Sequence, residues 1–421
     1  MTRMPGLRTR RSPAAALAAG VFVLSFFPAH TIRAGARAPT AASSTSYLFV
    51  THERPKAGRL DASGLWKVSL TGTVANVLGE EWRPSAVSAS GVVAANRTTD
   101  PTHAIWIFRT IGKSTEQTQL TESAGAACIA LSSDGQWLSF VTGSPGSVGR
   151  ADGRVPAVTG TLWSTARSNG SWSSKSAVAS GTFPLTECPT WSPRGHRLAF
   201  LVRDGQSGQW LVGIHSATID VRRRVAEATS FPPGVVHRRF EWSPSGRMLV
   251  AQDGFRLLKI VGDQVTGFSR TTLARVWNER GAWSALRFSP NGKFLAARVR
   301  SATGVFTSDG RLKMVIPQAF SGWAGNGRIL VLGPDKHALI TLSSIRVSRP
   351  GRGSRVETGF KLPVASDPNG SWFALVRPAG LRTVVFRRPD GTGARTVRLP
   401  FTTGLVATVG AGRVVLPETG Y

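Results

Sequence analysis

This chain lacks the features that mark many enzymes. Its seven histidines include no H-E-x-x-H pair, and no G-x-S-x-G nucleophile elbow occurs, so the common zinc-peptidase and serine-hydrolase motifs are excluded. No group of His, Cys, Asp and Glu has the spacing of a zinc site or an EF-hand. No long amphipathic helix pattern appears either. We therefore expect no metal and no cofactor, and we favour a protein that is not an enzyme.

Glycine, by contrast, is abundant, with 46 residues, and eight of them follow the same short turn motif. The clearest copies read W-S-P-R-G at 191–195, W-S-P-S-G at 242–246 and F-S-P-N-G at 288–292. The proline presets φ early in the turn, and the glycine takes a positive φ that other residues resist. The eight turn glycines are Gly91, Gly135, Gly195, Gly246, Gly292, Gly327, Gly370 and Gly412.

Apolar residues recur at two-residue spacing on both sides of these turns, as in Phe240 and Trp242 before one turn and Leu198 and Phe200 after another. A period of two indicates strands, so each copy predicts a β-hairpin. Successive turn glycines lie 35 to 60 residues apart, which leaves room for four strands per repeat. The prediction is an all-β fold, a single closed β-propeller of four-stranded antiparallel blades. Eight blades are favoured, and seven are the alternative.

A closed ring requires the two ends of the repeat region to pair with each other. Segments 405–409 and 413–416 are strand-like, and so is 47–50. An open ring would leave a sheet face and an edge in water. We therefore expect the C-terminal strands to complete the first blade beside the N-terminal ones.

A second motif follows several turns, in segments 64–70, 104–108 and 161–165, each with a tryptophan in its third position. These segments are expected to be third strands. Together the two motifs resemble the repeat of TolB-type, WD40-like propellers, over about residues 45–421. The resemblance implies a propeller and no particular activity, because neither the N-terminal domain of TolB nor a peptidase domain accompanies the repeats.

Many of the thirteen tryptophans occupy equivalent repeat positions. Large rings at equivalent places are expected to pack one blade against the next. The tryptophans predicted to lie in the core are Trp66, Trp106, Trp163, Trp191, Trp242 and Trp323. Those that lie off this register, and are candidates for a surface, are Trp172, Trp210, Trp277 and Trp283.

The N-terminus has the pattern of an export signal. Residues 1–11 carry four arginines and no acid, 14–27 are almost unbrokenly apolar, and A-R-A at 36–38 is a cleavage site. The apolar run of fourteen residues is shorter than the roughly 20 that span a bilayer, and an uncleaved anchor is the alternative. We predict a signal peptide at 1–38, a flexible leader at 39–45 and the propeller at 46–421. The mature protein would be periplasmic or extracellular, with no integral membrane span.

Acidic residues are too few to balance the charge. The chain has 52 Lys and Arg against 23 Asp and Glu, a net charge of +29, and removing the six arginines of the leader leaves +23. Arginine-rich surfaces bind phosphates and carboxylates through paired hydrogen bonds. The basic clusters predict a polyanion-binding site at Arg222, Arg223, Arg224, Arg238 and Arg239. The alternative is an arginine bias that serves solubility alone.

Few residues expected near the ring centre are of the types that catalysis requires. Among the positions just before the turns, Glu241 and Arg287 carry charge in adjacent repeats, and we expect them to form a structural ion pair. Asp134 is expected to serve its turn and not a metal. Isolated histidines near strand ends, such as His215, are expected to be merely exposed.

The two cysteines, Cys128 and Cys188, each lie seven residues before a turn glycine. Two considerations disagree about them. An exported chain favours a disulfide because its compartment is oxidising. Equivalent positions on consecutive blades, however, point in the same direction around the ring, and packed sheets lie about 10 Å apart, beyond the Cα separation of roughly 7 Å that a disulfide tolerates. We favour two free, buried thiols and keep the disulfide as the alternative.

Three functional hypotheses follow. The first is an exported, non-enzymatic propeller that binds a protein or a cell-envelope component. The second is an arginine-mediated binder of anionic polymers, whose binding would depend strongly on salt. The third is an enzyme with its site at the channel mouth, such as a lyase or lactonase. The natural ligand and the oligomeric state are not encoded in any motif.

Overall fold

The computed structural model of the chain is all-β. The chain separates into two units, Met1–Ser44 and Thr45–Tyr421. No α-helix occurs in the part that the structure describes, and no segment there has the length and hydrophobicity of a membrane-spanning helix. The described residues are 47–409 apart from gaps at 57–58, 112–113, 121–122, 124, 151–152, 186, 204–209, 217–220, 229–239, 254–255, 263, 269–282, 300–301, 335–339, 349–353, 359–360, 367–370 and 378–381.

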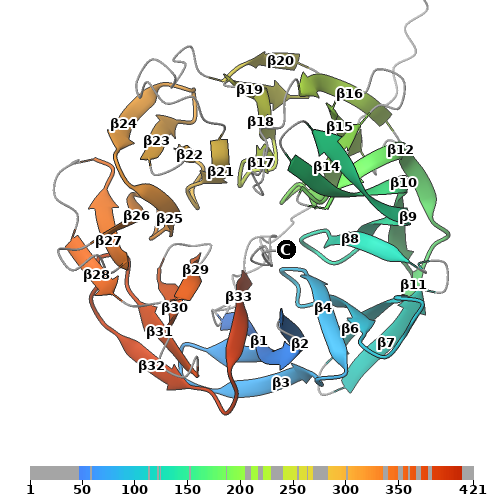
Figure 1. Ribbon diagram of the computed structural model, residues 1–421, viewed down its shortest axis with the longest axis horizontal. Helices are drawn as coiled ribbons and strands as arrows, with labels where there is room; N and C mark the ends of the chain where they lie inside the picture. The colour runs from blue at the N-terminus through green and yellow to red at the C-terminus, as the bar shows by residue number, and fades with distance from the viewer. Residues whose placement is uncertain are drawn as a thin grey trace, which may run out of the picture. The chain divides into compact units, whose positions relative to one another are not determined.

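The described strands form six four-stranded antiparallel sheets and one nine-stranded sheet. The first two four-stranded sheets are β1 (Tyr47–Lys56), β2 (Arg59–Ser69), β3 (Val74–Leu78) with β33 (Thr403–Val409), and β4 (Trp82–Val87), β5 (Val93–Arg97), β6 (Ile105–Ile111), β7 (Ser114–Leu120). The next two are β17 (Phe240–Trp242), β18 (Met248–Asp253), β19 (Arg256–Val261), β20 (Gln264–Gly267), and β21 (Trp283–Phe288), β22 (Phe294–Val299), β23 (Ala302–Thr307), β24 (Leu312–Ile316). The last two are β25 (Ala319–Trp323), β26 (Arg328–Pro334), β27 (Ile340–Arg346), β28 (Ser354–Thr358), and β29 (Lys361–Ser366), β30 (Phe373–Arg377), β31 (Thr383–Arg387), β32 (Arg395–Arg398). Figure 1 shows the sheets arranged around a common centre, as in a propeller.

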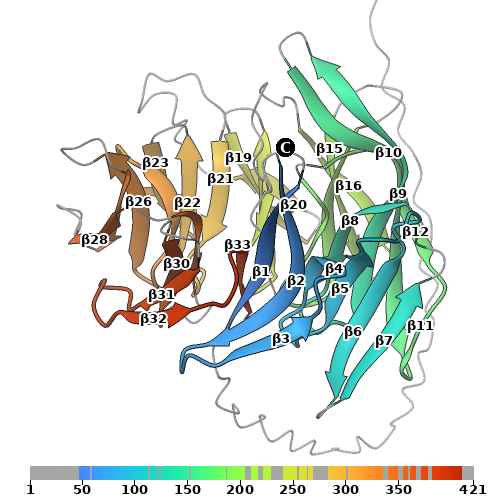
Figure 2. The same cartoon turned by 60° about the horizontal axis from the view of Figure 1, so that its bottom comes forward.

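The nine-stranded sheet lies between β7 and β17 in the chain. Its strands are β8 (Ala126–Leu131), β9 (Trp137–Arg150), β10 (Gly153–Ser168), β11 (Ser171–Trp172), β12 (Ser176–Pro184), β13 (Thr190–Trp191), β14 (Arg197–Arg203), β15 (Trp210–Ser216) and β16 (Val221–Ala228). One backbone pair, Thr182 with Arg203, connects β12 to β14. The β9–β10 hairpin is longer than the others and projects from the ring of sheets in Figure 2.

The predicted turns connect the first two strands of their repeats. Gly91, Gly135, Gly195, Gly246 and Gly292 all have a positive φ. In the best copies a serine closes the turn twice: the Ser289 backbone N–H donates to the Phe294 carbonyl at 2.8 Å, and its hydroxyl accepts the Phe294 N–H at 3.0 Å. This repeated geometry confirms the hairpins expected from the sequence.

Two details of this turn series differ from the prediction. Between β25 and β26 the residue with positive φ is Gly325, at +81°, rather than Gly327. Here the Ala324 backbone N–H donates to the Arg328 carbonyl, so the turn is one residue shorter than in the Ser-Pro copies, where Ser289 N–H donates to Phe294. Gly370 and Gly412 lie outside the described residues.

Apolar side chains fill the spaces between neighbouring sheets. Eight hydrophobic clusters among the described residues each join strands of successive groups. One of them packs Val50 and Trp66 of the first sheet against Trp372 and Phe386 of the last. Each fully buried Val, Leu or Phe contributes about 1.5–3 kcal/mol relative to an exposed one, so the free energy of folding resides mainly between the sheets.

Three tryptophans at the predicted core positions also make a repeated hydrogen bond, from the inner strand of one repeat to the inner strand of the repeat before it. The indole Nε1–H of Trp191 donates to the carbonyl of Ala130 at 3.2 Å. Trp242 donates to Thr190 at 3.0 Å, and Trp323 donates to the Arg287 carbonyl at 3.0 Å. Each bond joins one inner strand region to its predecessor, which confirms that these tryptophans pack the repeats together. Trp210, expected at a surface, is instead only 4% exposed, because it lies on β15 against the β17–β20 sheet.

The last described strand pairs with the first. β33 runs antiparallel to β1, with Tyr47 opposite Val409 and Val50 opposite Val406, and the two lie side by side in Figure 1. The expectation that C-terminal residues complete the first sheet is confirmed for 403–409, and 413–416 lie outside the described residues.

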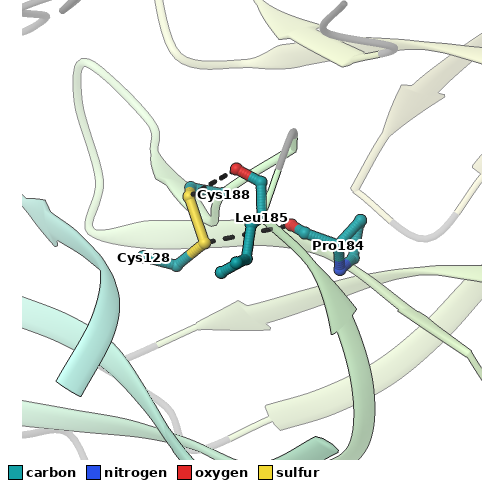
Figure 3. The surroundings of a disulfide bond; sticks show 4 residues. All are labelled: Cys128, Pro184, Leu185 and Cys188. Carbon is teal, nitrogen blue, oxygen red and sulfur yellow. Dashed lines mark hydrogen bonds between the residues drawn. A yellow bond between two sulfur atoms is a disulfide. The ribbon is translucent and has the colours of Figure 1, made fainter. Parts of the chain in front are cut away.

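Cys128 and Cys188 are joined by a disulfide, with their Cα atoms 4.9 Å apart (Figure 3). The prediction of two free thiols is therefore corrected. Cys128 lies at a register shift in β8 and has φ +52°, while Cys188 precedes β13 and belongs to no strand. Neither cysteine thus keeps the regular direction that the register assumed. Their sulfur atoms lie 3.9 and 3.5 Å from the carbonyl oxygens of Pro184 and Leu185.

Two turn glycines differ in how closely a neighbouring turn packs against them, and this difference predicts different costs of substitution. A Cβ on Gly246 would lie 2.6 Å from the Arg194 carbonyl oxygen of the preceding turn, whereas a Cβ on Gly195 meets nothing within 4 Å. Both residues have positive φ, +69° and +82°. We expect Gly195→Ala to cost about 1 kcal/mol from backbone strain alone, and Gly246→Ala to cost more because backbone must move. Thermal melts of the two purified variants test this, and equal losses would contradict packing between the turns.

The disulfide predicts how many reactive thiols the protein contains and how much stability depends on the bond. The denatured, unreduced mature protein should contain no reactive thiol, and reduction should release both. Replacing both cysteines with serine should lower the free energy of unfolding by about 4 kcal/mol, because the bond spans 60 residues and constrains the unfolded chain. Two reactive thiols before reduction would restore the register-based prediction.

Candidate functional site

Three of the five arginines predicted to bind polyanions lie among the described residues. Arg222, Arg223 and Arg224 lie on β16, the outermost strand of its sheet, where their backbones pair with His215, Ile214 and Gly213 of β15. Arg238 and Arg239 lie outside the described residues. The site at these five positions stays a prediction.

The ion pair expected at the inner strands is present. Arg287 Nη1 of β21 lies 3.4 Å from Glu241 Oε2 of β17, and the Glu241 side chain is only 8% exposed. Arg287 also accepts the Trp323 indole through its carbonyl. One residue thus connects three successive sheets. A buried carboxylate held by a guanidinium in this way stabilises the packing of its neighbours, since breaking such a pair would leave an uncompensated charge.

The structure contains a second buried acid near the inner strands, which no sequence motif predicted. Glu187 is 2% exposed, and its Oε1 accepts the backbone N–H of Phe240 at 3.4 Å. It therefore connects the residues before β13 to the first residue of β17. The adjacent Cys188 in the sequence was the one local indication that this segment is special.

Two turns of the nine-stranded sheet are joined by a carboxylate and an imidazole. Asp134 Oδ2 lies 2.7 Å from His196 Nε2, and the His196 ring lies against Trp137, with ring centroids 6.0 Å apart. Asp134 also accepts the Ser132 hydroxyl at 2.6 Å and the Gln136 N–H at 3.1 Å through Oδ1, as its predicted turn role requires. The sequence placed Asp134 correctly and missed His196, which lies 62 residues away.

This arrangement resembles parts of a hydrolytic triad, but its connections differ. In a triad the histidine lies between the nucleophile and the acid. Here Ser132 and His196 both bind the carboxylate of Asp134, one on each oxygen. Because the serine hydroxyl donates to the acid rather than to the imidazole, the cluster holds two turns together and does not activate a nucleophile.

The electrostatic environment of Asp134 reflects these contacts. Burial alone would raise its pKa and is the largest single influence, but the hydrogen bonds from Ser132, Gln136 and His196 together outweigh it and lower the pKa below the ordinary 3.8. The carboxylate is therefore the favoured form in the folded protein. Among the residues that the structure describes, no group of three His, Cys, Asp or Glu is placed to hold a metal ion.

Exposed positive charge concentrates on the last two sheets. Asp390 is the single carboxylate among the described side chains of 319–403. The arginine side chains described there are Arg328, Arg346, Arg377, Arg382, Arg387, Arg388, Arg395 and Arg398, and all but Arg328 and Arg387 are exposed. The sequence indicated that the C-terminal half is basic, but it did not indicate which arginines lie together.

Comparison with known proteins supports the fold. No family model matches the sequence, and no curated protein matches it. The structure is similar to apo AztD from Citrobacter koseri, at 12% identity with a TM-score of 0.50, over 87% of this chain and 98% of that one. It is also similar to the WD40 domain of Toxoplasma gondii coronin (14% identity, TM-score 0.41, 65% and 70% covered) and to TolB from Acinetobacter baumannii (15%, 0.37, 65% and 64%). No family match assigns the chain to the TolB type.

The Asp134 contacts predict a pH-dependent stability. Because the folded pKa is lowered, the stabilisation is present above the ordinary pKa and is lost as pH falls through the folded value. We expect Asp134→Asn to melt below the wild type near neutral pH and to converge with it as the pH falls below the ordinary 3.8 and through the lowered folded pKa. His196→Gln should reproduce part of the neutral-pH loss. Thermal melts across this range test the prediction, and a gap that persists in acid would assign the loss to packing alone.

Proposed function

We propose that this chain is an exported, non-enzymatic β-propeller that binds a protein or another component of the cell envelope. Two independent features support export. The N-terminal residues 1–38 have the charge, apolar run and A-x-A site of a cleaved signal. The Cys128–Cys188 disulfide is a bond that persists in oxidising compartments and is rare in the cytosol.

One observation carries the binding role: the charged groups at the inner strands are used to hold sheets together. Glu241 is engaged by Arg287, and the inner-strand carbonyls of Thr190 and Arg287 accept tryptophan indoles. The turns and outer strands present the remaining polar groups. Loops and turns on such a rigid scaffold are where binding residues commonly lie.

We also propose that the ring has eight blades. The nine-stranded sheet then divides into two blades, β8–β12 and β13–β16, which are joined at the single pair of Thr182 and Arg203. A hydrophobic cluster between these two groups, including Phe183 and Phe200, is what an interface between blades would contain.

Binding of anionic polymers is the second candidate. The exposed arginines of the last two sheets favour it, because only one described carboxylate lies among them. Such binding would weaken as salt rises, whereas a protein interface with an apolar centre would be much less sensitive.

Export and partner binding are tested together. In a bacterial host the full chain should be recovered outside the cytoplasm with its N-terminus at Pro39, and Ala38→Arg should block cleavage because the site needs a small residue. The mature protein should retain envelope material at both low and high salt if its partner is a protein. Retention lost at high salt would favour the anionic polymer. Recovery of the intact chain in the cytoplasm would refute the export proposal.

A further inference from the structure

Four arginines gather where the β25–β28 sheet meets the turn of the β29–β32 sheet. We call this the β27–β31 seam and define it as Arg328, Ser344, Arg346, Arg387, Arg388 and Asp390. The Ser344 hydroxyl of β27 donates to the Pro389 carbonyl at 3.0 Å, and Arg328 Nη1 donates to Ser344 Oγ at 3.4 Å. These contacts place residues from two sheets within one small surface.

The turn at the seam holds its own arginines close. Arg387 Nη1 donates to the Gly391 carbonyl at 3.0 Å. The Arg388 side chain lies beside Gly393, where an added Cβ would meet its Nε at 3.4 Å. Both guanidinium groups therefore lie against the turn whose Pro389 carbonyl accepts the Ser344 hydroxyl.

Arg328 and Arg346 are directly opposite one another on β26 and β27. Like charges at opposite positions of an antiparallel pair destabilise a sheet. Asp390 is the one described carboxylate at the seam and balances one of its four positive charges. It accepts the Thr392 hydroxyl at 2.6 Å and the Thr392 N–H at 2.9 Å. Those bonds, followed by the charge of Arg328, lower the pKa of Asp390. The seam keeps a surplus of positive charge, and an anion lying over it would relieve the repulsion.

We propose that the β27–β31 seam binds a linear phosphate polymer without bases, such as a polyphosphate or polyol-phosphate chain. Guanidinium groups match phosphate oxygens with paired hydrogen bonds, and the Thr392 hydroxyl borders the same surface. Ser344 lies beneath it and is only 1% exposed. None of the six seam residues is aromatic, so the seam has no ring on which a base would stack. The seam is an exposed surface, where a single ion pair is worth little. A chain that carries many phosphates gains affinity from several contacts at once. This proposal rests on the proposed function and names its anionic ligand.

Purified mature protein and inorganic polyphosphate test the proposal. The seam variant is Arg346→Ser with Arg388→Ser, since both side chains are exposed and neither makes a described bond that holds the fold. The matched control is Arg247→Ser with Lys313→Ser, which removes the same charge from two other exposed side chains that make no described bond. A third variant replaces Arg222, Arg223, Arg224, Arg238 and Arg239 with serine and tests the site predicted from sequence.

We expect the seam variant to bind polyphosphate at least about tenfold more weakly. Its melting temperature should equal or slightly exceed that of the wild type, because Arg346→Ser removes the repulsion with Arg328. Its slope of log affinity against log salt should fall by about one to two. The control and the five-arginine variant should bind within about twofold of the wild type. An equal loss in the seam variant and the control would overturn the proposal, since the charge would then act diffusely. A loss confined to the five-arginine variant would also overturn it.

Three further probes define the ligand class. Dextran sulfate, a single-stranded oligonucleotide and vesicles of anionic lipid should each bind more weakly than polyphosphate and respond less to the seam variant. A seam-dependent preference for any of them would overturn the assignment of a base-free phosphate chain. Because these measurements use purified protein, failed export in cells would leave their outcome readable, and failed binding would leave export untouched.

Discussion

Each sheet of this ring has two apolar faces, and both must be covered by neighbours. β18 illustrates the constraint: Leu249 packs toward the β14–β15 strands, while the next residue, Val250, packs toward the β21–β24 sheet. No sheet is stable with only one neighbour, so the series must return to its start. The cluster that joins Val50 to Trp372 and the pairing of β33 with β1 meet that requirement. Indole bonds and turn contacts then fix the spacing of sheets that burial has already brought together.

This constraint also decides where charge can lie. A sheet covered on both faces leaves little room for an unpaired ion, and Glu241 enters the interior together with Arg287. The described arginines of the last two sheets lie in turns or at the ends of strands, and most of them are exposed. A basic chain with this fold therefore presents its charge on its turns and strand ends. The seams between sheets are the places where arginines distant in sequence come together, as Arg328 and Arg388 do around Ser344 and Pro389.

Local features of this fold could be predicted from the sequence because their causes are local. The Ser-Pro-x-Gly turns, the two-residue periodicity and the core role of Trp242 each depend on a few adjacent residues. Trp210 was assigned to a surface because its position in the repeat is irregular, although its neighbours across the interface bury it. The cysteines were misjudged because a bulge in β8 changes the direction of Cys128, and bulges leave no period to detect. The seam depends on contacts between residues of different sheets, which no single-sequence pattern contains.

The interface between β8 and the β13 region has a covalent cross-link. From one end to the other it contains the Cys128–Cys188 disulfide, the bond from Trp191 to Ala130, and the pair of Asp134 and His196. These three links have almost the same sequence offset, so they lie in order along one edge. The same strand group carries the β9–β10 hairpin, whose strands of 14 and 16 residues extend well beyond the sheet. A long projecting hairpin transmits any force at its tip to the base of its sheet as leverage. The covalent and polar links along the inner edge would resist that rotation.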